Sequence, residues 1–409
     1  MMACPDGRRS VAAPKGAAAW GKFARLLAVA RLGAAAGLLG VGGACGSDEN
    51  DAVGTVAPNE PPPSMPSESD TTSRETNPAP NPGLAQDAPP VDPMAPAPGA
   101  YGERAALLAP NSEMAVAEAG GEIYVLGGYP SSRDVQTTVQ VYTPATNRWR
   151  FAAPMPLPTH HPVAIGVDGS LYSLGGQLTG DVNTDRAFVL DTAADTWTEV
   201  APLPTARGGG AVARIGGLLY VVGGRPPAGN AFEAYDIASD TWTVLPTLPQ
   251  TYDQRNHLIA VAIADKIYVA GGRYDGGGFA SPMTDSLDVY DPVSATWSSA
   301  APMLRPRGGI NGVAALGCFY VWGGEGQGIG EANDVFPDHD VYDPQANTWT
   351  ALPPLPTPVH GVTGSAFLDG LLYMPGGGTA AGGNSGSVIH QVYRVDRSCD
   401  GAPLPDMLR

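Results

Sequence analysis

Basic residues are scarce in this chain of 409 residues. The sequence holds 23 lysines and arginines against 40 aspartates and glutamates, a formal net charge of −17, and Lys266 is the only lysine after residue 44. Such an acidic chain repels phosphate backbones and lacks a polybasic patch for a membrane surface. We therefore expect no nucleic-acid partner, and no membrane contact through the folded part.

Long apolar runs and several catalytic motifs are also missing. The uncharged run 32–44 has 13 residues, whereas a membrane-spanning helix needs about 20. No serine stands in a Gly-x-Ser-x-Gly elbow, and the glycine-rich segment 276–278 lacks the lysine and helix of a phosphate loop. The six histidines form no His-x-His cluster. The sequence thus predicts neither a metal site nor a cofactor, and it assigns no catalytic residue.

What the sequence does contain is a repeat. Six short apolar strands each end in a pair of glycines, and the first glycines are Gly127, Gly175, Gly223, Gly271, Gly323 and Gly376. These glycines are 48, 48, 48, 52 and 53 residues apart, which is the period of one four-stranded propeller blade.

A second landmark follows in five copies, where a strand such as Tyr235-Asp236 leads to a tryptophan. The tryptophans are Trp149, Trp197, Trp242, Trp297 and Trp349. Alternating Tyr and Val are typical of short, half-buried strands. We interpret these segments as strands three and four, and we expect a buried Trp197 whose replacement by alanine costs about 3 to 5 kcal/mol.

The sixth copy stops after its third strand, 392–396, without a tryptophan. The missing strand is found at the other end of the repeat. Tyr101 stands 26 residues before Gly127, the interval that also separates Trp149 from Gly175. We therefore expect the N-terminal strand to complete the sixth blade, which leaves no long exposed sheet edge.

The glycine pairs, tyrosines and tryptophans resemble the kelch repeat over residues 101–396, and the resemblance implies an all-β, six-bladed kelch-type β-propeller. The predicted domains are an export signal at 1–44, a disordered proline-rich acidic linker at 45–100, the propeller at 101–397 and a tail at 398–409. We expect a monomer.

The first 44 residues have the composition of an export signal, because a basic segment precedes the apolar run. Small residues before Cys45 resemble the bacterial lipoprotein signal, in which that cysteine is acylated. This predicts a lipoprotein of the cell envelope, at the outer membrane or cell surface, held by its N-terminal lipid. Cleavage and release, giving a periplasmic or secreted protein, is the alternative. In an exported chain, Cys318 and Cys399 are candidates for a disulfide.

Candidate binding residues gather in the loops of one face of the predicted ring, where loop length also points to function. They are Arg207, Arg225, Arg255, Asn256, His257, Arg273, Arg305, Arg307, Glu325, His161 and His360. Arginine forks bind carboxylates in two-point geometry. Kelch repeats, however, commonly have an arginine before the first strand, where Arg207 and Arg307 stand. We favour ligand contact for Arg225 and Arg273 and leave both roles open for Arg207 and Arg307.

Three functions fit this sequence. A binding module for a protein or an acidic carbohydrate is the preferred one. The alternative is a mutarotase or epimerase resembling N-acetylneuraminate epimerase, in which Glu325 with His257 or His360 would act as acid and base. A copper radical oxidase is the remote alternative, because both propeller cysteines are expected on the opposite face.

Overall fold

Each repeat of the sequence forms one four-stranded antiparallel sheet in the computed structural model, which describes residues 92–249, 254–274 and 278–404. The first three blades contain β2 (Met114–Ala119), β3 (Glu122–Leu126), β4 (Val139–Thr143) and β5 (Arg148–Phe151); β6 (Val163–Val167), β7 (Ser170–Leu174), β10 (Ala187–Asp191) and β11 (Thr196–Val200); and β12 (Ala211–Ile215), β13 (Leu218–Val222), β14 (Phe232–Asp236) and β15 (Thr241–Val244). The predicted signal and most of the linker lie outside the described residues.

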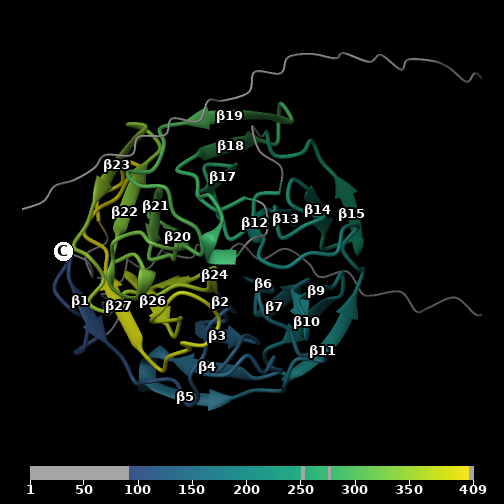
Figure 1. The fold of residues 1–409 in the computed structure, drawn as a ribbon, viewed down its shortest axis with the longest axis horizontal. Helices are drawn as coiled ribbons and strands as arrows, with labels where there is room; N and C mark the ends of the chain where they lie inside the picture. Colours follow the sequence, from purple (N-terminus) through teal and green to yellow (C-terminus); the bar gives the residue numbers. More distant parts are fainter. Residues whose placement is uncertain (1–91, 250–253, 275–277, 405–409) are drawn as a thin grey trace, which may run out of the picture. The chain divides into compact units, whose positions relative to one another are not determined.

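The other three blades complete the ring. They contain β16 (Ile259–Ile263), β17 (Lys266–Ala270), β18 (Leu287–Asp291) and β19 (Thr296–Ala300); β20 (Asn311–Ala315), β21 (Cys318–Trp322), β22 (His339–Asp343) and β23 (Thr348–Ala351); and β25 (Ala366–Leu368), β26 (Leu371–Pro375), β27 (His390–Arg394) and β1 (Tyr101–Glu103). Figure 1 shows the first strands around the centre and the fourth strands at the rim. The prediction of a six-bladed all-β propeller is confirmed.

The closure expected from the sequence is also confirmed. β1 pairs antiparallel with β27, with Tyr101 opposite Tyr393. A second link is the two-residue strand β24 (Val362–Thr363), which runs parallel to β2. Blade six therefore joins the first and last parts of the repeat region through backbone hydrogen bonds.

Helix is nearly absent, because short strands and the tight turns between them make up almost the whole repeat. The described residues contain only the 3₁₀ turns η1 (Pro144–Thr146), η2 (Gly278–Ala280) and η3 (Ala332–Asp334), and a small hairpin, β8 (Gln177–Leu178) with β9 (Val182–Asn183), projects from blade two. None of these helical turns could cross a membrane.

Apolar side chains pack between neighbouring blades. Ala117 and Tyr124 of blade one, for example, share a cluster with Leu171 and Leu190 of blade two. Each rim tryptophan adds a hydrogen bond to the preceding blade, as where Trp197 Nε1 donates to Ala153 O at 3.0 Å. Trp197 is only half-buried, so the expected cost of 3 to 5 kcal/mol for its replacement by alanine is too high: that range applies to a fully buried side chain.

Cys318 and Cys399 form a disulfide. It joins the start of β21 to the segment after β27, 81 residues later in the chain. The tail is thus attached to blade five through a covalent bond as well as through the apolar cluster that contains both cysteines.

Candidate functional site

Each blade has a turn just before its first strand, and backbone hydrogen bonds link these turns from one blade to the next. The equivalent residues are Glu113, His161, Gly209, His257, Gly309 and Gly361, with φ angles of 53°, 52°, 67°, 54°, 66° and 69°. Along this series, each backbone N–H after the first donates to the carbonyl oxygen of the preceding member, at 2.7, 3.0, 2.7, 3.0 and 3.3 Å. We call these six residues the inner ring.

Three members of the inner ring are not glycine. A positive φ is easy for glycine but costs other residues of order 1 kcal/mol or more. Glu113, His161 and His257 nevertheless occupy it, and all three are buried. Their side chains meet: Glu113 Oε2 is 2.8 Å from His161 Nε2, and the His161 and His257 rings lie 4.8 Å apart. Strain retained in mutually facing polar residues is typical of functional sites.

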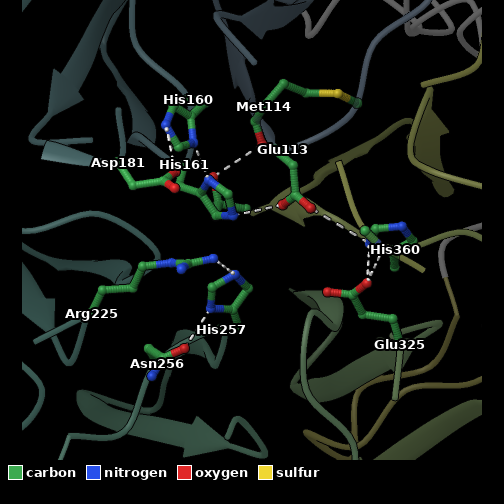
Figure 2. A network of polar contacts seen from close by, with 12 residues as sticks. Glu113, Met114, His160, His161, Asp181, Arg225, Asn256, His257, Glu325 and His360 are labelled. Carbon is green, nitrogen blue, oxygen red and sulfur yellow. Dashed lines mark hydrogen bonds and ion pairs between the residues drawn. The ribbon is translucent and has the colours of Figure 1, made fainter. Parts of the chain in front are cut away.

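A second layer of side chains comes from the residues that follow the glycine pairs. In blades three, four and five these are Arg225, Arg273 and Glu325. Arg273 Nη1 donates to Glu325 Oε1 at 2.8 Å, and Arg225 Nη2 is 3.4 Å from His257 Nε2. Figure 2 shows Arg225 beside His257, on the side away from Glu325. We call the inner-ring side chains with Arg225, Arg273, Glu325 and His360 the polar cluster.

His360 connects the two carboxylates of the polar cluster. Its Nδ1 lies 3.4 Å from Glu325 Oε2 and 3.7 Å from Glu113 Oε1, while Nε2 is 2.7 Å from the Ala380 carbonyl oxygen and donates to it. The Gly382 N–H also donates to Glu325 Oε2 at 2.7 Å. Glu325 is therefore already held by a guanidinium and a backbone amide.

Supporting side chains fix the two inner-ring imidazoles. His257 Nδ1 is 2.6 Å from Asn256 Oδ1, and His161 Nδ1 is 2.6 Å from His160 Nδ1 (Figure 2). The His160 ring stacks on Tyr129 with centroids 4.4 Å apart. Since an amide oxygen only accepts, His257 carries its proton on Nδ1, and its Nε2 lone pair faces Arg225 Nη2.

Burial sets the charge states in the polar cluster. It lowers the pKa of His161 and His257; Glu113 opposes this shift at His161, and the nearby Arg225 and Arg273 lower the pKa of both further. It lowers the pKa of His160 to about 3. Burial alone would raise the pKa of Glu113, but His161, His360 and Arg273 outweigh it and lower that pKa. At neutral pH these shifts favour neutral imidazoles at His161 and His257 beside an ionised Glu113.

Arg225 is the unbalanced charge of this site. It is half-buried, no carboxylate in the described part of the chain lies within ion-pair distance of it, and its Nε has no hydrogen-bond partner there. Burial and the neighbouring Arg273 lower the pKa of its guanidinium. A desolvated cation without a counter-ion is costly, and an anionic ligand would remove that cost.

Three of the arginines proposed from the sequence lie inside blades instead. Arg207, Arg255 and Arg307 are almost fully buried, and each forms an ion pair with a strand-three carboxylate of its own blade. The partners are Glu233, Asp288 and Asp340. These guanidiniums also donate to backbone carbonyls, as Arg307 Nη1 does to Gly323 O at 3.2 Å. Their hydrogen-bonding capacity is used by the fold.

Arg305 also lies outside the polar cluster. It pairs with Glu331 at 2.9 Å and Asp338 at 3.3 Å and covers the Phe336 ring. Glu113 was not among the residues predicted from the sequence. A signal was available: Glu113, His161, Gly209, His257 and Gly309 each stand 14 residues before a first glycine, and Gly361 stands 15 before.

A separate cavity of about 300 Å³ lies between the first strands of the six blades. Its lining is mostly small and apolar, with residues such as Ala164, Ala213 and Gly312, and it contains the charged residues Glu118 and Arg214. None of the polar cluster lines it. The disulfide of Cys318 and Cys399 leaves neither of these thiols for the cysteine-linked tyrosine of a copper radical oxidase.

This chain matches the model of a known sequence family and has the fold of a solved structure. The KLHDC2/KLHL20/DRC7 kelch-repeats domain matches residues 108–272 and 159–377. Kelch-like protein terF of Aspergillus terreus is 31% identical over 176 residues, 43% of this chain and 35% of that protein. Human Kelch-like protein 34 is 34% identical over 125 residues, 30% of this chain and 18% of that protein. This chain therefore spans about a third or less of these relatives.

A solved structure, "Structure of YjhT", has a TM-score of 0.60 and covers 72% of this chain and 98% of its own. Its sequence identity is 16%. At that identity the likeness concerns the propeller fold alone.

Proposed function

Because the chain belongs to the kelch-repeat family, whose propellers typically serve as interaction modules, we propose that it is a binding module for an acidic ligand. The observation that carries this proposal is Arg225, a half-buried guanidinium with no carboxylate partner in the described residues. A carboxylate of a protein or a carbohydrate would supply the missing counter-ion in two-point geometry.

The test is a thermal-shift screen of the full-length chain against carboxylated sugars, matched neutral sugars and acidic peptides. A ligand of the folded state at 100 times its dissociation constant adds about 2.7 kcal/mol of stability. We expect an acidic compound to raise Tm, and Arg225→Ala to abolish that rise. Arg186→Ala is the matched control, because Arg186 is exposed and pairs with Glu199. Equal shifts with neutral compounds, or an unchanged shift in Arg225→Ala, would contradict the proposal.

A second candidate is mutarotation or epimerisation of a carboxylated sugar. The favouring observation is that Glu113 and His257 bring a carboxylate oxygen and a ring nitrogen within 4.8 Å of each other, with Arg225 Nη2 3.4 Å from His257 Nε2. For mutarotation, His257 Nε2 would take the proton of the anomeric hydroxyl while the bond between the anomeric carbon and the ring oxygen breaks, and the imidazolium so formed would give that proton to the ring oxygen; reclosure on the other face of the carbonyl carbon gives the other anomer. NMR exchange between anomers distinguishes the two functions: a binding module shifts the Tm but leaves the exchange rate at its uncatalysed value.

We also propose that the protein is exported and held in the cell envelope by a lipid on Cys45. The support is the basic and apolar pattern of residues 1–44, together with a disulfide, which is typical of oxidising compartments.

A further inference from the structure

We propose that Glu113, His161 and His257 bind a divalent transition-metal ion of the zinc class at the inner ring. The proposal goes beyond ligand binding at Arg225 and does not depend on it. Two histidines and one carboxylate form a recurrent ligand set for catalytic zinc and for non-haem iron, with coordination positions left open.

The positions of the ligand atoms support this site. One ligand atom from each of the three side chains lies within 4.8 Å of the others, and all three residues are buried. Glu113 Oε2 and His161 Nε2 are 2.8 Å apart, and neither atom has another partner in the described part of the chain. Two ligands with metal bonds of about 2.0 to 2.1 Å stand roughly 3.0 to 3.4 Å apart around one ion. The Glu113–His161 pair is already close to this separation, and the ligand atom of His257, which lies within 4.8 Å of both, would complete the set by moving inward.

Neighbouring side chains orient both imidazoles toward the centre. Asn256 Oδ1 accepts the Nδ1 proton of His257, and Asn256 Nδ2 donates in turn to Gln254 O at 3.0 Å. His161 Nδ1 is engaged by His160. His161 Nε2 then faces Glu113 Oε2, and His257 Nε2 has the long contact of 3.4 Å with Arg225 Nη2. Metal-binding histidines usually have such a partner on their second nitrogen, which fixes the tautomer and the ring plane.

The inner ring itself singles out these three residues. The positive φ is met by glycine in blades three, five and six, and by a non-glycine only in blades one, two and four. Those three exceptions are the complete ligand set. Glycine at these positions would remove about 1 to 3 kcal/mol of strain per residue, so the side chains must contribute something that the backbone turn does not require.

The surrounding charges decide between this set and a neighbouring one. Glu113, Glu325 and His360 also place ligand atoms within 4.8 Å. Glu325, however, already accepts from Arg273 and from the Gly382 amide. At the first set, Arg225 Nη2 lies 3.4 Å from His257 Nε2 and would have to move when an ion binds, whereas the other nearby cation, Arg273, is held by Glu325. We therefore assign the ion to Glu113, His161 and His257.

The experiment is titration of the chelator-treated full-length chain with Zn²⁺ by calorimetry, and with Co²⁺ by visible absorption. The informative variants are His161→Gly and His257→Gly, because glycine is the residue that other blades use at this turn. We expect each to weaken Zn²⁺ binding at least tenfold and to lose the Co²⁺ spectrum. Without metal, their Tm should equal or exceed that of the parent. Glu113→Gln, which keeps the shape of the side chain, should also lose Zn²⁺.

Glu325→Gln is the matched control and should retain Zn²⁺ binding. Loss in Glu325→Gln with retention in both glycine variants would overturn the assignment in favour of the neighbouring set. Unchanged binding in all four variants would place any zinc site elsewhere in the chain, and no binding by the parent would refute the metal altogether. A ligand shift that depends on Arg225 without Zn²⁺ would leave the proposed binding function standing in either case.

Discussion

Replacing Arg307 by alanine tests whether the buried arginines hold the blades together. The Arg307 side chain is fully buried, forms an ion pair with Asp340 and donates to Gly323 O at 3.2 Å and Asp338 O at 3.1 Å. Burial already raises the pKa of Asp340, and the charge of Arg307 opposes that rise. Arg307→Ala leaves this carboxylate without its cation and removes one donor from each of the two carbonyls; Asp338 O keeps the Gly323 N–H at 2.9 Å.

The expected loss is large because the pair is desolvated. Removing one partner of a buried ion pair costs about 3 to 5 kcal/mol. With an unfolding entropy of about 2.1 cal/mol/K per residue over roughly 300 residues, this lowers Tm by about 5 to 8 °C. Denaturant unfolding at pH 7 gives the free energy, and differential scanning calorimetry gives Tm.

The double variant Arg307→Met with Asp340→Leu provides the control. It removes both charges and keeps apolar volume, so it should recover most of the lost stability. The reasoning would be refuted if the double variant were as unstable as Arg307→Ala. It would also be refuted if Arg307→Ala kept the parent Tm but lost the Tm shift produced by an acidic ligand, since that result would assign Arg307 to the ligand.

Two further predictions concern pH and location. Burial lowers the pKa of His339 and of His390 to about 3, whereas a histidine in the unfolded chain has a pKa of about 6.5. As the pH falls, the unfolded chain therefore binds these protons first. The free energy of unfolding is at its full value above about pH 7 and falls by about 1.4 kcal/mol per pH unit for each histidine between pH 6 and 4. Denaturant unfolding at pH 7 and pH 5 measures this, and equal free energies at the two values would contradict it. Cys45→Ala should move the exported protein from the detergent-soluble membrane fraction to the soluble fraction, and an unchanged membrane fraction would argue against the lipid.

The fold could be predicted because its strongest requirements are local. A glycine pair must end strand two, where Gly127 has a φ of 62° and an added Cβ would lie 2.3 Å from Thr159 O. Such a position excludes every other residue. The pairing of Tyr101 with blade six was also predictable, because the interval from Tyr101 to the next glycine pair equals the interval from Trp149 to its next glycine pair.

The arginine partners were harder to predict because the pairing is between strands. Arg207 and Glu233 are 26 residues apart in the chain, and their ion pair depends on the register that joins the segment before strand one to strand three. An arginine before strand one can point into its blade or toward the loops, and the sequence leaves both open. The acids at the second position of strand three, Asp288 and Asp340 among them, could have indicated the inward direction.

The polar cluster could not be predicted in this way, because it consists of residues at which the blades differ from one another. Six blades present the same turn at the centre, and the backbone bonds of the inner ring need only a positive φ. Glycine meets that need at the lowest energetic cost. A residue other than glycine at this turn is therefore not required by the backbone, and its side chain can serve a chemical function. The three blades that depart from glycine carry Glu113, His161 and His257, and these side chains converge. In a closed ring of similar blades, residues far apart in sequence meet wherever the repeat position lies nearest the axis. Function in this propeller should therefore be sought by comparing equivalent positions across blades, and motifs within a single blade are less informative.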